Sequence, residues 1–255
     1  MHSETQLFID LLLGMTQKEL QARYKRTVFG FLWVVINPVL QMVVIGFIFR
    51  FFIKEPIINY YFYLLIGLLM WNFFTLSLTK ATPSIVFERS LIKKARFPRM
   101  VIPLSIVLSN FVHFVLSLIL FIPLTMFVGI FSFTTLPALL LAIALLLLFT
   151  IGLSLLTSAL NVRFRDVNFF VQALLIIWFY ATPIVYSISV VPRDVIWLWR
   201  LNPLTAIVQL FQYALVEAPG PGPAMITLNT LEIMVILGLG WYTFQKLSKE
   251  FDDWV

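Results

Sequence analysis

Side chains that could perform catalysis are scarce in this sequence of 255 residues. Its two histidines, His2 and His113, lie far apart in the chain. Cysteine is absent, which excludes disulfides, thiolate metal ligands and thiol redox chemistry. No Gly-Lys-Ser or Gly-Lys-Thr occurs, so a Walker-type loop for ATP is missing. We therefore expect no catalytic residue, no metal site and no cofactor in this chain.

Two ionisable residues, His113 and Glu232, lie within long apolar segments. Asn110 lies one turn before His113, so the pair could relay a proton, although an interhelical hydrogen bond is the more ordinary role. Glu232 could bind a coupling ion, or it could pair with one of three basic residues, Arg50, Lys54 or Arg200. A membrane enzyme such as a lipid-modifying transferase would have to use this small set.

The densest charge in the chain lies between Glu88 and Arg99, and five of the 18 Lys and Arg residues fall between Arg89 and Arg99. The 24 residues 56–79 before this segment are uncharged, and the 63 residues 100–162 after it contain no Asp, Glu, Lys or Arg. A basic segment between two runs that can each cross a bilayer indicates a cytoplasmic loop.

The composition indicates an all-α polytopic membrane protein with a single transmembrane domain over 1–255. Hydrophobic residues make up 61% and charged residues 12%, against about 25% charged residues in soluble domains. We predict six transmembrane helices at about 31–53, 60–80, 102–130, 137–160, 168–188 and 225–245. With the N-terminus inside, 14 of the 18 basic residues fall on the inner side and 4 on the outer side, so both termini should be cytoplasmic. The net charge of +6 is thereby explained without a nucleic-acid partner.

Three further segments should not cross the membrane. Residues 3–27 would form an amphipathic helix, with apolar side chains on one face and polar side chains on the other, which suits the membrane interface. Thr82-Pro83 resembles a helix start and Pro98 a stop, which predicts a cytoplasmic helix over 83–97. Residues 191–216 contain an apolar helix, capped by Asn202-Pro203, that is too short to cross, so we expect re-entrant helices on the outer side.

Aromatic residues are abundant, and some could line a path for sugars, whose C–H faces stack on aromatic rings. The candidates lie beside two proline breaks: Trp33, Trp178, Phe179, Tyr180 and Tyr186. The ordinary alternative for each of them is packing.

Several blocks together resemble the polysaccharide-export permeases, of O-antigen or teichoic-acid type, of the ATP-binding-cassette transporters. The blocks are YKRTVFGFLW at 24–33, WNFF at 71–74, LIKKARFPR at 91–99, SALNVRFRDV at 158–167 and LNPL at 201–204. They occur in the order that the family has, over nearly the whole chain.

The resemblance implies a homodimer in the bacterial inner membrane that pairs with two copies of a separate ATPase, which binds ATP and Mg. The dimer would form a channel for a lipid-linked polysaccharide. The helix between the second and third spans would dock in a groove of the ATPase, and the re-entrant helices would close the outer side. An exporter of drugs, other small molecules or glycolipids in the same superfamily is the alternative.

The residues expected at the ATPase contact are Glu88, Arg89, Leu91, Ile92, Lys93, Lys94 and Arg96. The competing interpretation is a simple basic anchor on the inner side of the membrane. We favour docking because Ile85, Phe87, Leu91 and Ile92 would provide the helix with an apolar face to bury.

Overall fold

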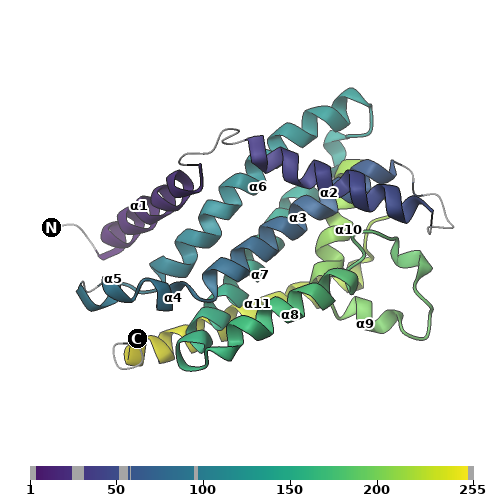
Figure 1. Cartoon of the computed structure of the whole chain (residues 1–255). Coiled ribbons are helices and arrows are strands. Elements are labelled where there is room, and N and C mark those ends of the chain that lie inside the picture. The colour runs from purple at the N-terminus through teal and green to yellow at the C-terminus, as the bar shows by residue number, and fades with distance from the viewer. Residues whose placement is uncertain (1–3, 25–31, 52–56, 58, 95–96, 252–255) are drawn as a thin grey trace.

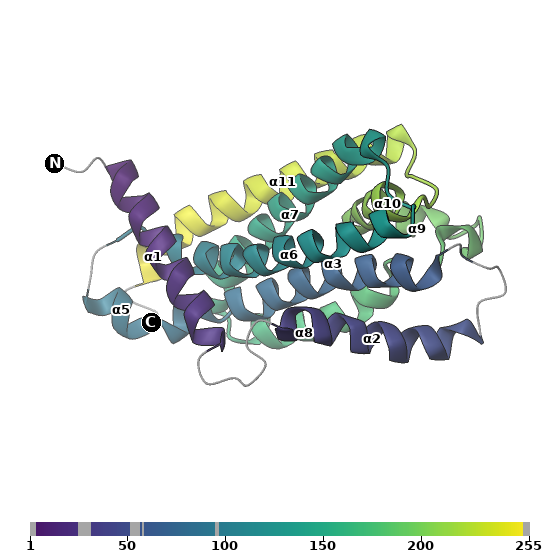
Figure 2. The same cartoon turned by 90° about the horizontal axis from the view of Figure 1, so that it is seen from above.

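The computed structural model describes residues 4–24, 32–51, 57, 59–94 and 97–251, and every regular element in these ranges is a helix (Figure 1). The long helices run side by side as an elongated bundle, and α1 (Glu4–Tyr24) crosses one end of it (Figure 2). The prediction of an all-α fold is therefore confirmed for the described residues.

Four of the described helices are long and apolar enough to cross a membrane. They are α3 (Tyr60–Ala81), α6 (Val101–Phe127), α7 (Leu136–Arg163) and α11 (Pro223–Leu247), and they correspond to the second, third, fourth and sixth predicted spans.

The remaining two predicted spans correspond to shorter apolar helices, α2 (Trp33–Arg50) and α8 (Asp166–Tyr180). With 15 residues, α8 extends about 22 Å, less than the ~30 Å of a hydrocarbon core. It ends well before residue 188 because Pro183 lacks a backbone N–H and disfavours helical backbone at Thr182. The count of six spans therefore stays a prediction.

The centre of the bundle is α3, which packs against α2, α6, α7, α8 and α10 (Pro203–Val216). Thirteen of the 14 residues of α10 are buried. Asn202 caps this helix, since its side-chain oxygen accepts a hydrogen bond from the Leu204 N–H at 3.1 Å. A 3-10 turn (Ile188–Val190) and α9 (Ile196–Arg200) precede it, so residues 191–216 form short helices at the end of the bundle where α3 begins (Figure 1).

Helices α7 and α11 touch through two glycines. A Cβ on Gly240 would collide with the carbonyl oxygen of Gly152, and a Cβ on Gly152 would lie 2.8 Å from the Cα of Leu237. Small residues let the two backbones approach closely, which is how apolar helices associate without a hydrophobic driving force.

The predicted helix over 83–97 is two short helices in the described residues, α4 (Ser84–Phe87) and α5 (Arg89–Lys94). Glu88 interrupts them because its backbone (φ −90°, ψ 24°) leaves the helical region. Thr82 does not cap α4: its backbone continues α3, and its hydroxyl donates to Thr157 Oγ1 at 2.9 Å. The start of α1 and the end of α11 lie at the same end of the bundle as α4 and α5 (Figure 1), and we call this the inner end.

Candidate functional site

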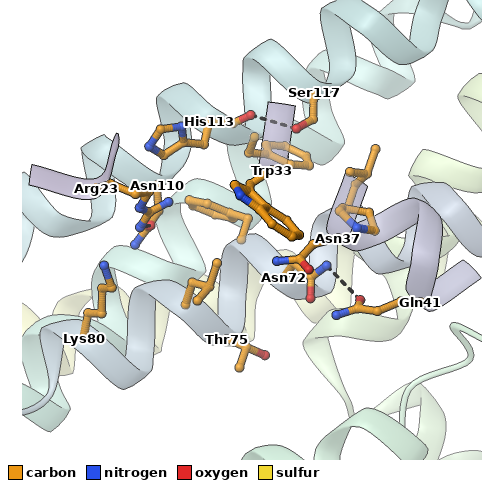
Figure 3. Close-up of a pocket in the computed structure, with 15 residues that line it drawn as sticks. Arg23, Trp33, Asn37, Gln41, Asn72, Thr75, Lys80, Asn110, His113 and Ser117 are labelled. Atoms are coloured by element: carbon orange, nitrogen blue, oxygen red, sulfur yellow. Dashed lines mark hydrogen bonds between the residues drawn. The ribbon is translucent and has the colours of Figure 1, made fainter. Parts of the chain in front are cut away.

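A cavity of about 430 Å³ opens between α1, α2, α3 and α6 in the inner half of the bundle (Figure 3). We call it the inner cavity. Its lining consists of Arg23, Trp33, Asn37, Pro38, Gln41, Leu69, Asn72, Phe73, Thr75, Leu76, Lys80, Asn110, His113, Phe114 and Ser117. Of the five aromatic residues that the sequence suggested for a transport path, Trp33 is the one in this lining.

The inner cavity is cationic at one end and amide-rich farther in. Arg23, in the last turn of α1, donates a hydrogen bond from Nη2 to Asn110 Oδ1 on α6. Lys80 lies in the last turn of α3, and Arg23 interacts electrostatically with both Lys80 and His113. The carboxylate of Glu19 also interacts electrostatically with Lys80, but it does not line the cavity.

Deeper in the cavity, the Asn72 amide on α3 donates to Gln41 Oε1 on α2 at 3.0 Å. Trp33, Phe73 and Phe114 supply aromatic surface beside these amides. The arrangement can bind a molecule that carries an anionic group at one end and has polar and apolar surface behind it.

We call the opposite end of the bundle, where α3 begins, the outer end. The other predicted aromatic residues lie from the last turn of α8 onward, outside the lining of the inner cavity. Trp178 on α8 donates from Nε1 to Asn202 Oδ1 at 2.9 Å, and its ring lies edge-on to Phe74 and Phe149 at centroid distances of 5.5 and 5.8 Å. Phe179 packs edge-on against Trp71, and the Tyr180 side chain is exposed. The structure therefore places Trp178 and Phe179 in packed positions and does not bring these side chains together with Trp33.

Tyr186 joins two segments of the outer end. Its hydroxyl donates to the Tyr180 carbonyl at 2.7 Å and accepts from Trp199 Nε1 at 2.7 Å.

Two tyrosines that the sequence did not single out hold the chain after α8. Tyr63 donates to the Tyr186 carbonyl at 3.0 Å, and Tyr60 donates to the Val185 carbonyl at 3.2 Å. The available signal was that the two tyrosines are three residues apart, and so share one face of α3, while a proline break elsewhere in the chain leaves backbone carbonyls in need of donors. We call Tyr60, Tyr63, Trp178, Tyr186, Trp199 and Asn202 the outer network.

The residues predicted to contact an ATPase divide into buried and exposed groups. Ile92 packs, with Ile85, among the inner ends of α6, α7 and α11, and Leu91 is half-buried. Arg89, Lys93 and Lys94 are exposed. Arg96 lies outside the described residues.

Two side chains of this loop differ in role from the sequence expectation. Glu88 pairs through Oε1 with Lys18 Nζ of α1 at 3.1 Å. Phe87 was expected on the buried face, but 77% of it is exposed. It is exposed because it follows Ile85 by two residues within α4, which places it about 200° around the helix from that buried side chain.

His113 and Glu232 belong to different sites. His113 lines the inner cavity, whereas Glu232 on α11 accepts from Asn229 Nδ2 at 2.8 Å, and the same Nδ2 donates to the Arg200 carbonyl at 2.8 Å. An ion pair between Glu232 and the Arg200 side chain is not formed, although both residues are described. Within the described ranges no three His, Cys, Asp or Glu side chains cluster as metal ligands would.

Comparison with known proteins agrees with a membrane permease. The family model described as "ABC-2 type transporter" matches residues 10–216. The chain is 33% identical over 247 residues to an O-antigen export system permease protein, RfbA, of Myxococcus xanthus, covering 95% of this chain and 94% of that protein. It is 36% identical over 253 residues to a protein of the same name from Klebsiella pneumoniae, covering 96% of this chain and 94% of the relative.

Proposed function

This chain belongs to the ABC-2 type transporter family, and we propose on that premise that it is the permease subunit of an ATP-driven polysaccharide exporter. The observation that carries the proposal is similarity over nearly the whole chain to O-antigen export permeases from two organisms. The substrate is a lipid-linked, O-antigen-like polysaccharide that moves from the cytoplasm across the inner membrane. ATP and Mg are bound and ATP is hydrolysed by a separate ATPase chain, present in two copies.

We propose that α2 and α8 complete a set of six membrane spans and that both termini are cytoplasmic. The distribution of 14 basic residues on the inner side against 4 on the outer side supports this orientation. The start of α1, the end of α11 and the basic α4–α5 loop lie at one end of the bundle, as that topology requires (Figure 1).

We propose that α4 and α5 form the surface that receives the ATPase. Ile85 and Ile92 attach this loop to α6, α7 and α11, so a push on it reaches three long helices. Lys93 and Lys94 face outward, and the exposed Phe87 adds an apolar contact between the two short helices. An apolar side chain flanked by charges on a short helix suits docking in a groove.

We further propose that the permease works as a homodimer whose two copies enclose the polysaccharide path. Several helices, α11 among them, expose apolar side chains that lipid or a second copy must cover. On α2 and α8 these include Leu40, Val43, Val44 and Phe47, and Phe169, Phe170, Ile176 and Ile177, respectively.

Transport is tested directly by reconstituting the permease with its ATPase in liposomes and supplying a lipid-linked glycan on the ATPase side. We expect ATP-dependent appearance of glycan on the opposite side, measured by protection from an added glycosidase. ATP hydrolysis without any glycan movement would refute the proposal.

The docking surface is tested by charge reversal, with Lys93→Glu and Lys94→Glu combined. We expect lost assembly with the ATPase, or ATP hydrolysis that no longer drives export. The matched control is Lys246→Glu with Lys249→Glu, since these lysines are exposed at the same end of the bundle on another element. Coupling that survives the first pair in a normally inserted protein would favour the simple basic anchor.

A second candidate function is export of a small amphipathic molecule. The observation in its favour is the inner cavity, because about 430 Å³ with aromatic walls falls in the size range of drug-sized sites. ATP-dependent efflux of a hydrophobic dye, together with no movement of lipid-linked glycan, would replace the first function with this one.

A further inference from the structure

The inner cavity gathers positive charge without a carboxylate in its lining. Arg23 and Lys80 come from the last turns of α1 and α3, and the two cations repel each other electrostatically. None of the described residues that line the cavity is Asp or Glu. An anion seated between the two cations would relieve the repulsion, because opposite charges a few ångströms apart attract strongly at a partly buried site.

A buried donor points into the same space. Asn110 is 2% exposed, and its Oδ1 is occupied by the hydrogen bond from Arg23. Its Nδ2 is buried and has no hydrogen-bond partner within the described part of the chain. A buried N–H group left without an acceptor costs about 1–3 kcal/mol, so this donor is suited to an acceptor that a ligand would supply. Figure 3 shows Arg23, Asn110 and Lys80 at the same end of the cavity.

The position and size of the cavity favour an anion attached to a lipid. The cationic end lies where α1 and α3 finish, at the inner end of the bundle, which is the level of lipid headgroups in the proposed topology. The lining then extends along α3 from Lys80 to Leu69, which is about 17 Å of helix. A volume of about 430 Å³ is that of a small-molecule site, so it can take a headgroup or a terminal sugar but not a polymer.

The wall behind the cationic end suits a sugar next to the anion. The amides of Asn72 and Gln41 are already paired, and they retain hydrogen-bonding capacity for hydroxyl groups. The rings of Trp33 and Phe73 lie beside them, and aromatic faces accept the C–H faces of sugars.

We propose that the inner cavity binds the phosphate group of a lipid-linked glycan, with Arg23 and Lys80 as its cations and the Asn110 amide as a donor. This inference rests on the proposed export function and adds the place where the phosphate end of that substrate is held. A phosphate diester of an ordinary membrane phospholipid presents related chemistry, so the experiment has to separate the two sources.

The test measures binding to the permease–ATPase complex in maltoside micelles, which carry no phosphate, with the ATPase sites saturated by ADP and Mg. The probe is farnesyl diphosphate, and titration calorimetry gives its Kd. Farnesol, inorganic diphosphate and a short-chain phosphatidylglycerol are the comparison ligands. We expect farnesyl diphosphate to bind, farnesol to fail, and phosphatidylglycerol to compete poorly.

Arg23→Gln and Lys80→Gln should each weaken binding of farnesyl diphosphate at least tenfold, and Asn110→Leu several-fold. Arg23→Lys and Lys80→Arg should recover most of the affinity, which a purely structural role would not produce. Lys246→Gln, at an exposed lysine outside the cavity, should bind as the wild type does.

Unchanged affinity in correctly folded Arg23→Gln and Lys80→Gln proteins would overturn the assignment. Equal competition by phosphatidylglycerol would also overturn it, because the site would then belong to membrane phospholipid. Failure of the export function would be recognised separately, since the wild type would then move no lipid-linked glycan in liposomes. If the wild type transports and the cavity variants transport with an unchanged KM, this inference alone is wrong.

Discussion

The two ends of α3 contribute polar side chains to opposite kinds of environment. At the outer end, Tyr63 donates to the Tyr186 carbonyl, and Asn202 accepts from Trp178 and donates to the Ala181 carbonyl. At the inner end, Lys80 faces a cavity in which the amide nitrogen of Asn110 has no partner within the described residues.

The difference between the outer network and Asn110 indicates which of these groups hold the fold together and which can receive a ligand. Groups whose hydrogen bonds are satisfied within the protein rigidify one arrangement. A buried donor without an acceptor, beside two cations, can be satisfied when an anionic ligand binds. Substitutions in the outer network should therefore lower the stability of the protein, whereas substitutions in the inner cavity should mainly weaken ligand binding.

The largest effect is expected from Gly67→Leu on the packed side of α3. A Cβ at this position would lie 2.9 Å from Cγ2 of Ile184, in the segment that the outer network holds. Because a leucine would force that segment away, we expect a loss of about 3 kcal/mol or more, seen as aggregation or a strongly lowered Tm. Gly14→Leu is the control, since nothing lies within 4 Å of a Cβ there. Equal behaviour of the two variants would mean that the outer segment is loose.

Asn202→Leu should follow, with a loss of about 2–4 kcal/mol from a removed helix cap and from an unsatisfied Trp178 N–H. The measurement is the Tm of the purified protein, followed by tryptophan fluorescence. Trp178→Phe in the same background should cause little further loss, because the donor that Asn202 left unsatisfied is then absent. Full additivity of the two changes would contradict the hydrogen bond at 2.9 Å between them.

Asn72→Leu is the inner counterpart and should lower stability by about 1 kcal/mol, the usual net value of one hydrogen bond. Its amide makes a single bond of 3.0 Å to Gln41, and it faces the inner cavity. The change should show instead in transport, as a raised KM for the glycan. A drop in Tm as large as that of Asn202→Leu would remove the proposed contrast between the two ends.

The smallest effect is expected from Glu88→Gln, which breaks the ion pair with Lys18 at 3.1 Å. The lysine side chain is 60% exposed, and surface pairs of this kind contribute about 0–1 kcal/mol. The Tm values of the wild type and the variant should differ slightly at low salt and become equal at high salt, because salt screens the ion pair. A difference that persists in high salt would indicate a structural role for Glu88 beyond the pair.

Much of the scaffold could be predicted because long uncharged segments have few alternatives in a membrane. The helices α3, α6, α7 and α11 follow from length and hydropathy alone. The Asn202-Pro203 pair likewise predicted the start of α10. The break at Glu88 was missed because α4 and α5 bury Ile85 and Ile92 on one surface, and a tertiary contact of that kind overrides local helix signals.

The candidate site was harder to predict, because its parts come from separate elements. In the sequence, Arg23 and Lys80 are ordinary basic residues of the inner side. They line the same cavity because α1 packs against α6. For His113, with Asn110 one turn before it, the sequence left a proton relay and an interhelical hydrogen bond open, and the hydrogen bond that Asn110 accepts from Arg23 was not predicted. Trp178 was proposed for a path on residue type, whereas the bond to Asn202 that fixes it depends on the fold of residues 181–203.

The contact between Gly152 and Gly240 has a mechanical consequence. With the backbones of α7 and α11 in contact, one helix cannot slide past the other without lifting away from it. At the inner end Phe244 and Phe251 share a cluster with Ile85 and Ile92 of the loop, and at the outer end Asn229 holds the Arg200 carbonyl of α9. The two helices should therefore move as one rigid unit about 37 Å long. A force applied to the loop at the inner end would then displace α9 at the outer end.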